Sequence, residues 1–169
     1  MINLIEKIRT HDDYPIPGIT FFDLFPAISE SETFFYLIDQ LYEVCKNYPV
    51  TKVVGIDARG LIFGAPLAYK FKAGFIPARK TNKLPGKIIS EGYSKEYGTD
   101  NVAIQQDMIT ADDYVLIVDD IIATGGTAQA LEKLIARYTK NICHLFLLEL
   151  KELKGVTKLS CDYKIVYSI

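Results

Sequence analysis

The chain has 169 residues, of which 49% are hydrophobic, so its length favours one domain with a sizeable core. Its 19 basic and 21 acidic residues nearly balance, which gives no general reason to expect a nucleic-acid or membrane partner. No apolar run reaches 18 residues, so the sequence predicts no membrane span. Three widely spaced cysteines, Cys45, Cys143 and Cys161, favour reduced thiols in a cytoplasmic protein over disulfides or a zinc site.

The first 50 residues predict two helices separated by a stiff loop. Leu4, Ile5 and Ile8 would form the apolar face of an amphipathic helix over residues 1–9, and charged residues interrupt the run that a signal peptide needs. Two prolines and a glycine predict an extended loop over residues 13–23, whose aromatic rings favour core packing. Apolar residues at helical spacing predict a second helix over residues 31–47.

The rest of the chain alternates between strands and helices, which predicts an α/β fold with a mostly parallel sheet. Strands are expected over residues 51–57, 75–79, 102–106, 115–118, 142–150 and 163–167. Helices are expected over residues 61–71 and 128–138, and a turn or short helix over 151–158. Residues 80–99 show little apolar periodicity, so they predict a long mobile loop that could include a small hairpin; loops of this length are usually functional lids or disordered segments.

The most specific stretch is residues 115–127, which reads VLIVDDIIATGGT. Its apolar start suits a strand buried on both faces, and Asp119 and Asp120 follow where that strand would end, at the edge where α/β sheets bind ligands. A small, flexible turn then precedes a helix whose free N–H groups and dipole favour an anion. That turn consists of Ala123, Thr124, Gly125, Gly126 and Thr127.

Taken alone, the Gly-Thr turn is explained equally well as a helix cap, and the acid pair as solvated residues. No lysine follows the glycines, so the turn is not a P-loop, and it lacks the dinucleotide fingerprint. The whole stretch resembles the phosphoribosyl-pyrophosphate signature of the type I phosphoribosyltransferases. In that family the turn holds the 5-phosphate, and the acid pair accepts hydrogen bonds from the ribose hydroxyls.

Four segments, residues 13–23, 57–64, 79–98 and 115–127, together resemble the adenine phosphoribosyltransferases. The early Pro-x-Pro-Gly-Ile-x-Phe and the later Lys-Leu-Pro-Gly…Glu-Tyr-Gly narrow the wider family to the adenine enzymes. The resemblance implies one domain over residues 1–169: a mostly parallel sheet flanked by helices, with a small N-terminal hood that binds the base and a mobile lid. It also implies transfer of the phosphoribosyl group to N9 of adenine, giving AMP and pyrophosphate in purine salvage.

The resemblance places the pyrophosphate at Asp57, Ala58 and Arg59, whose guanidinium can grip phosphate oxygens in a bidentate way. A cis peptide between Asp57 and Ala58 is common in such enzymes. The alternative is a surface arginine that caps a strand end.

Three basic residues, Arg79, Lys80 and Lys83, open the lid and would neutralise pyrophosphate; the alternative is a run of solvated charges. In the family, residues like Arg79 can reach the neighbouring subunit's site, which implies a homodimer. Magnesium is implied on the pyrophosphate and ribose oxygens of the substrate, with few direct protein ligands.

The lid motif contains Glu96 and Tyr97, and by resemblance Glu96 is the acid that meets the imidazole edge of the purine. Without the motif it would be read as a solvated loop glutamate. Ile19, Thr20 and Phe21 correspond to the base-binding segment, where Phe21 could stack on adenine and the backbone near Thr20 could read its polar edge.

One position departs from the family: Phe22 stands where many relatives carry Arg or Lys, so no contact is assigned to that side chain. Two rival functions are a phosphoribosyltransferase for an oxopurine and a regulator that senses phosphoribosyl pyrophosphate. The early segment and the lid argue against the first rival. The absence of a basic excess or of room for a nucleic-acid-binding domain argues against the second.

Overall fold

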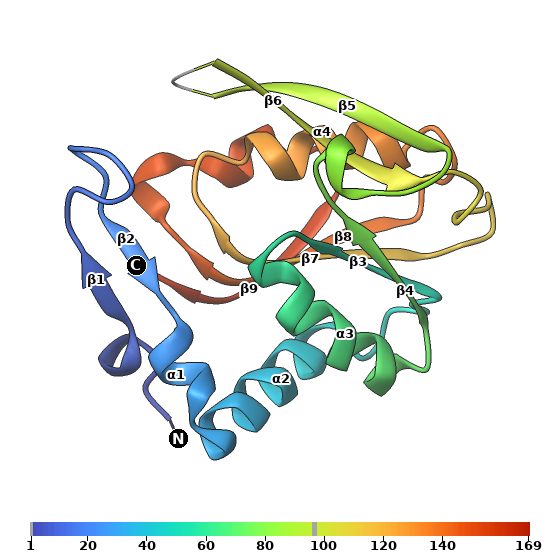
Figure 1. Ribbon diagram of the computed structural model, residues 1–169. Helices are drawn as coiled ribbons and strands as arrows, with labels where there is room; N and C mark the ends of the chain where they lie inside the picture. The colour runs from blue at the N-terminus through green and yellow to red at the C-terminus, as the bar shows by residue number, and fades with distance from the viewer. Residues whose placement is uncertain (1, 96–97) are drawn as a thin grey trace. The chain divides into compact units, whose positions relative to one another are not determined.

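A computed structural model describes residues 2–95 and 98–169 (Figure 1). The chain forms two compact units, residues 1–40 and 41–169, whose boundary falls inside α2 (Ser31–Cys45). Among the described residues, no helix has both the length and the apolar character that crossing a membrane requires.

The first unit contains a two-stranded antiparallel sheet of β1 (Arg9–His11) and β2 (Phe21–Asp23), followed by α1 (Phe25–Ser29). The helix predicted over residues 1–9 is wrong: within residues 2–8 the structure has only a 3-10 turn, η1 (Ile5–Lys7), and β1 begins at Arg9. The loop between the strands is closed by hydrogen bonds, including one from the Gly18 N–H to the Asp13 carboxylate (2.8 Å). Tyr14 is 55% exposed, so core packing does not explain this ring.

The second unit is built on a five-stranded parallel sheet in the order β4-β3-β7-β8-β9. Its strands are β3 (Lys52–Ile56), β4 (Gly74–Ala78), β7 (Val115–Ile122), β8 (Ile142–Glu149) and β9 (Asp162–Ser168). β7 and β8 are buried along nearly their whole length, as their unbroken apolar runs predict.

The chain leaves this sheet in opposite directions from β3 and β7. The helix α3 (Arg59–Phe71) leads from β3 outward to β4, whereas α4 (Gly126–Ile135) leads from β7 outward to β8. Because parallel crossovers are right-handed, the two helices must cover opposite faces, as Figure 1 shows. The β3–β7 junction is therefore the topological switch point, where open α/β sheets bind their ligands.

Most of the segment predicted as a long mobile loop forms a hairpin, so the hairpin that the loop could include is present and is longer than expected. The 3-10 turn η2 (Thr81–Lys83) precedes β5 (Ile88–Lys95), which pairs with β6 (Gly98–Gln105) in antiparallel register. The hairpin lies against α4 (Figure 1). After β8 the chain forms two 3-10 turns, η3 (Lys151–Leu153) and η4 (Gly155–Lys158), where a turn or short helix was predicted.

Candidate active site

The acid pair lies at the switch point, although β7 is longer than predicted. Its pairing with β3 stops at Gly55–Val118, whereas its pairing with β8 continues to Ile122. Asp119 and Asp120 are therefore strand residues on the β8 side but lie beyond the last pair on the β3 side. Pairing with β8 gives the two aspartates a rigid backbone. On the β3 side they lie just beyond the last pair, near the end of β3, which Asp57 follows.

The two carboxylates have different surroundings. Asp120 is only 3% exposed, and its Oδ2 lies 2.7 Å from Nε of Arg59. Asp119 is half-buried, and its Oδ1 accepts the backbone N–H of Asp120 (2.9 Å). Burial raises the pKa of both acids. For Asp119 the neighbouring carboxylate raises the pKa further, whereas for Asp120 the Arg59 guanidinium opposes the rise.

The predicted pyrophosphate residues converge at the ends of β3 and β4. Asp57 receives a hydrogen bond from Nε of Arg79 to its Oδ2 (2.9 Å), and Nζ of Lys83 lies 3.9 Å from the same oxygen. Lys80 reaches Oδ2 of Asp100 on β6 at 3.0 Å. The cations are thus held in place by carboxylates, and Asp100 is a site residue that the sequence did not reveal, because its partner lies across the lid hairpin.

The backbone between β3 and α3 also has the expected form. The Asp57–Ala58 peptide is cis, as the resemblance implied. Gly60 follows in the first turn of α3, where a Cβ would lie 2.5 Å from the Val118 carbonyl oxygen. Only glycine allows this approach of the loop to β7.

Two cavities of the second unit contain most of the predicted residues. The larger, of about 290 Å³, is lined by Asp57, Ala58, Arg79, Lys80 and Lys83, with Tyr93 and Asp100 from the hairpin. The smaller, of about 110 Å³, is lined by the turn from Ala123 and Thr124 through Gly125 and Gly126 to Thr127. Asp119 and Thr127 line both cavities, so the acid lies between a basic compartment and a helix N-terminus.

The small cavity is shaped by a glycine in a left-handed conformation. Gly125 has φ +74° and caps α4, which begins at Gly126. The first N–H groups of a helix have no partner inside it, so this turn presents donors together with the positive end of the helix dipole. Such a turn suits a phosphate group.

The predicted base-binding residues lie in the first unit. Oγ1 of Thr20 donates a hydrogen bond to Oδ1 of Asp12 (3.0 Å), and the ring of Phe21 meets Tyr14 edge-on, with centroids 5.2 Å apart. Ile19 accepts a backbone hydrogen bond from Tyr14 through its carbonyl oxygen (3.0 Å). The predicted lid residues Glu96 and Tyr97 lie outside the described residues.

Comparison with known proteins agrees with this geometry. Residues 35–164 match the family model described as the phosphoribosyl transferase domain. An adenine phosphoribosyltransferase from Maridesulfovibrio salexigens is 44% identical over 160 residues, which cover 94% of each chain. This chain belongs to the adenine phosphoribosyltransferase family.

The fold of adenine phosphoribosyltransferases is also the fold seen here. The crystal structure of the enzyme from Rhodothermus marinus has a TM-score of 0.93 and 41% identity, covering 98% of this chain and 96% of that one. The Saccharomyces cerevisiae enzyme, complexed with adenine and an imino-altritol bisphosphate, has a TM-score of 0.89 and 37% identity, covering 96% of each chain. The predicted family, enzyme class and parallel α/β fold are thereby confirmed.

Proposed function

We propose that this chain transfers the phosphoribosyl group of phosphoribosyl pyrophosphate to N9 of adenine, releasing pyrophosphate and AMP in purine salvage. The observation that carries the proposal is the position of Asp119, which lines both the basic cavity and the cavity under the Thr-Gly-Gly-Thr turn. A substrate with phosphate groups on both sides of a ribose ring matches that order of compartments.

In the proposed complex, the 5-phosphate lies in the small cavity and accepts hydrogen bonds from the turn of residues 123–127. The ribose 2- and 3-hydroxyls donate to Asp119, the less buried member of the acid pair. Ionised carboxylates only accept hydrogen bonds, which suits them to a diol. Asp119 is assigned the direct contact because it lines both cavities, and the more buried Asp120 is assigned to hold Arg59 in place.

The pyrophosphate then occupies the basic cavity, next to the Asp57–Ala58 backbone. Its oxygens replace carboxylates as partners of Arg79, Lys80 and Lys83, whereas Arg59 keeps its Nε contact with Asp120 and offers its other guanidinium nitrogens to the pyrophosphate. The ion pairs with Asp57 and Asp100 hold these cations near their working positions before the substrate arrives, which reduces the reorganisation needed on binding. Magnesium enters as part of the substrate, bound mainly by pyrophosphate and ribose oxygens. No group of three or more His, Cys, Asp or Glu within residues 2–95 and 98–169 is placed to hold a metal.

In the transfer step, the bond from the ribosyl carbon to pyrophosphate breaks while N9 of adenine forms the new bond, and the imidazole ring of adenine gives up its proton to the carboxylate of Glu96. Positive charge develops on the ribose, and the leaving group gains negative charge. The neighbouring carboxylates favour the first change and the basic residues favour the second, so positioning and electrostatics account for catalysis. Adenine is assigned to Ile19, Thr20 and Phe21 of the first unit, together with Tyr97 of the predicted lid. Both units are then needed for one activity, so residues 1–169 act as one functional domain.

We further infer that the protein is cytoplasmic and works as a homodimer, both on the family resemblance. Cys45, Cys143 and Cys161 are free thiols, which agrees with a reducing compartment.

The test is pyrophosphate release with magnesium and phosphoribosyl pyrophosphate, compared for adenine, hypoxanthine, guanine and xanthine. Release with adenine alone, together with AMP formation, supports the proposal. Release mainly with an oxopurine would retain the phosphate sites but overturn the assignment of the base. Binding of phosphoribosyl pyrophosphate without release for any base would favour the regulator.

Glu96→Ala is expected to lower kcat by roughly 100-fold or more, because a side chain positioned for proton transfer contributes about 10²–10⁴ to the rate. Affinity for phosphoribosyl pyrophosphate should stay nearly unchanged, since the proposed contact of Glu96 is with the purine. Steady-state kinetics with both substrates would check this, with Glu91→Ala in β5 as the control. Unchanged turnover for Glu96→Ala would remove the assigned role.

A further inference from the structure

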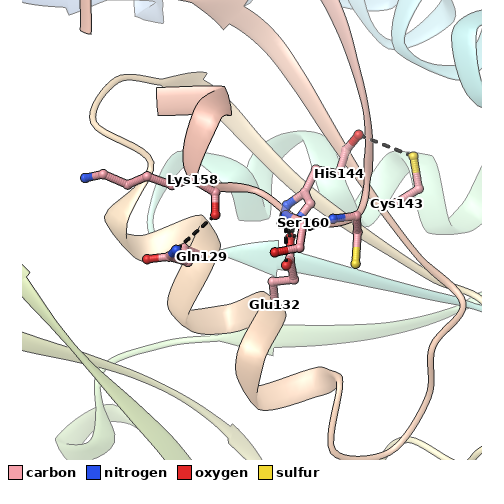
Figure 2. Close-up of polar contacts among 7 residues, drawn as sticks. Gln129, Glu132, Cys143, His144, Lys158 and Ser160 are labelled. Atoms are coloured by element: carbon pink, nitrogen blue, oxygen red, sulfur yellow. Dashed lines mark hydrogen bonds and ion pairs between the residues drawn. The ribbon is translucent and has the colours of Figure 1, made fainter. Parts of the chain in front are cut away.

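The segment from Gly155 to Cys161, called here the α4 strap, runs along one face of the phosphate-binding helix. Nε2 of Gln129 donates to the Lys158 carbonyl oxygen (2.9 Å), and the Glu132 carboxylate accepts the backbone N–H of Ser160 (3.1 Å) and of Cys161 (3.4 Å) (Figure 2). Together with Gly125, these two helix residues are spaced by four and three positions. They therefore lie on the same side of α4.

The far end of the α4 strap is anchored to the sheet through a buried polar group. Oε2 of Glu132 lies 2.9 Å from Nε2 of His144 on β8, and the two residues are 5% and 0% exposed (Figure 2). Glu132 therefore connects the helix, the strap and the sheet at one point. An anchor of this kind allows the other end of the strap to hold a fixed position against the turn that precedes α4.

At that other end, Gly155 lies directly behind the phosphate-binding turn. A Cβ on Gly155 would lie 2.2 Å from the Ala123 carbonyl oxygen and 2.9 Å from the Gly125 nitrogen. A Cβ on Gly125 would in turn lie 2.3 Å from the Gly155 carbonyl oxygen. These neighbours are backbone atoms, so a side chain could be accommodated only if the backbone of the turn or of the strap moves.

We propose that Gly155 is a positioning residue for the 5-phosphate, and that the α4 strap sets the location of the turn whose other side forms the small cavity. This inference rests on the proposed function of that turn. Phosphate affinity depends on several donors converging at hydrogen-bonding distance, and small displacements of such donors are costly. The sequence shows only a turn at Gly155, because the contact joins residues 30 positions apart.

The test is Gly155→Ala, compared with Gly74→Ala, where the three atoms nearest to the new methyl group belong to the flexible Lys52 side chain. Calorimetry would measure binding of AMP, which carries a 5-phosphate, and of magnesium pyrophosphate, which does not. For Gly155→Ala, the Kd for AMP should rise by about 10- to 100-fold. The Kd for pyrophosphate, and both Kd values of the control, should stay within about twofold of wild type.

An equal loss of AMP and pyrophosphate binding would indicate general loosening and overturn the proposal, as would unchanged AMP binding. If Gly155→Ala does not fold, Gln129→Met replaces it, because this change removes the hydrogen bond from α4 to Lys158 at the middle of the strap. A several-fold weakening confined to AMP is the expected result, and no selective change would contradict the proposal. Wild-type protein that binds neither probe would overturn the proposed function as well. Normal wild-type binding with an unaffected variant would overturn this inference alone.

Discussion

Asp119→Asn should lower kcat/KM for phosphoribosyl pyrophosphate by about 100-fold, because hydrogen bonds to a charged group contribute roughly 1.5–3 kcal/mol each and two ribose hydroxyls are involved. Asparagine keeps an oxygen that can still accept the Asp120 N–H, so the backbone of β7 should be retained. Steady-state kinetics with phosphoribosyl pyrophosphate as the varied substrate would measure the loss.

The same substitution should make the folded protein more stable at neutral pH. Burial and the Asp120 charge raise the pKa of Asp119, so the folded state disfavours the ionised form. A group whose pKa is raised in the folded state stabilises that state fully at pH values below its ordinary pKa, which is 3.8 for Asp119. This stabilisation is lost as pH rises through the pKa that the group has in the folded protein. The gain for Asp119→Asn should thus be absent in strong acid and should grow as pH rises through the raised pKa of the folded state.

Urea unfolding at several pH values would measure this gain, with Asp112→Asn in an exposed turn as the matched control. Normal kinetics for Asp119→Asn would undo the ribose assignment. A loss of stability at pH 7 would show that the native site favours the ionised carboxylate. Together, the two expected results describe an acid that is retained for binding at a cost in stability.

Glu132→Ala should destabilise the fold by about 3 kcal/mol, since removing one member of a buried polar pair leaves its partners unsatisfied. The substitution leaves Nε2 of His144 and the backbone N–H groups of Ser160 and Cys161 without the carboxylate that accepts their hydrogen bonds. Among the described residues, Nδ1 of His144 has no hydrogen-bond partner, which favours the tautomer with its proton on Nε2, donated to Glu132. The free energy of unfolding in urea would measure the effect.

The matched variants are Glu132→Gln, which keeps an acceptor oxygen and should cost less, and Glu152→Ala, an exposed acid that should cost little. Although burial acts to raise it, the pKa of Glu132 is lowered by His144 and by the backbone N–H groups. The ionised Glu132 carboxylate should therefore stabilise the folded protein at pH values above its ordinary pKa of 4.5. This stabilisation should be lost as pH falls through the lower pKa that Glu132 has in the folded state. Equal stability of Glu132→Ala and wild type at pH 7 would contradict the role of the pair.

Local patterns were sufficient to predict most of the sheet. The apolar runs over residues 115–118 and 142–150 identified β7 and β8, because strands buried on both faces need continuous apolar side chains. The N-terminal prediction failed because three apolar residues at helical spacing also suit a short turn that leads into a strand. The strand itself, Arg9–His11, is exposed throughout and so has no alternation to detect.

The sequence by itself determined the family and the chemical character of the site, because the acid pair, the glycine turn and the basic residues each occupy a few neighbouring positions. Only the tertiary structure decided how these pieces combine. It paired Arg59 with Asp120, Lys80 with Asp100 and Glu132 with His144, and it brought Gly155 behind Gly125. Such contacts join residues that are distant along the chain, and local periodicity carries no information about which distant residues the sheet order will bring together.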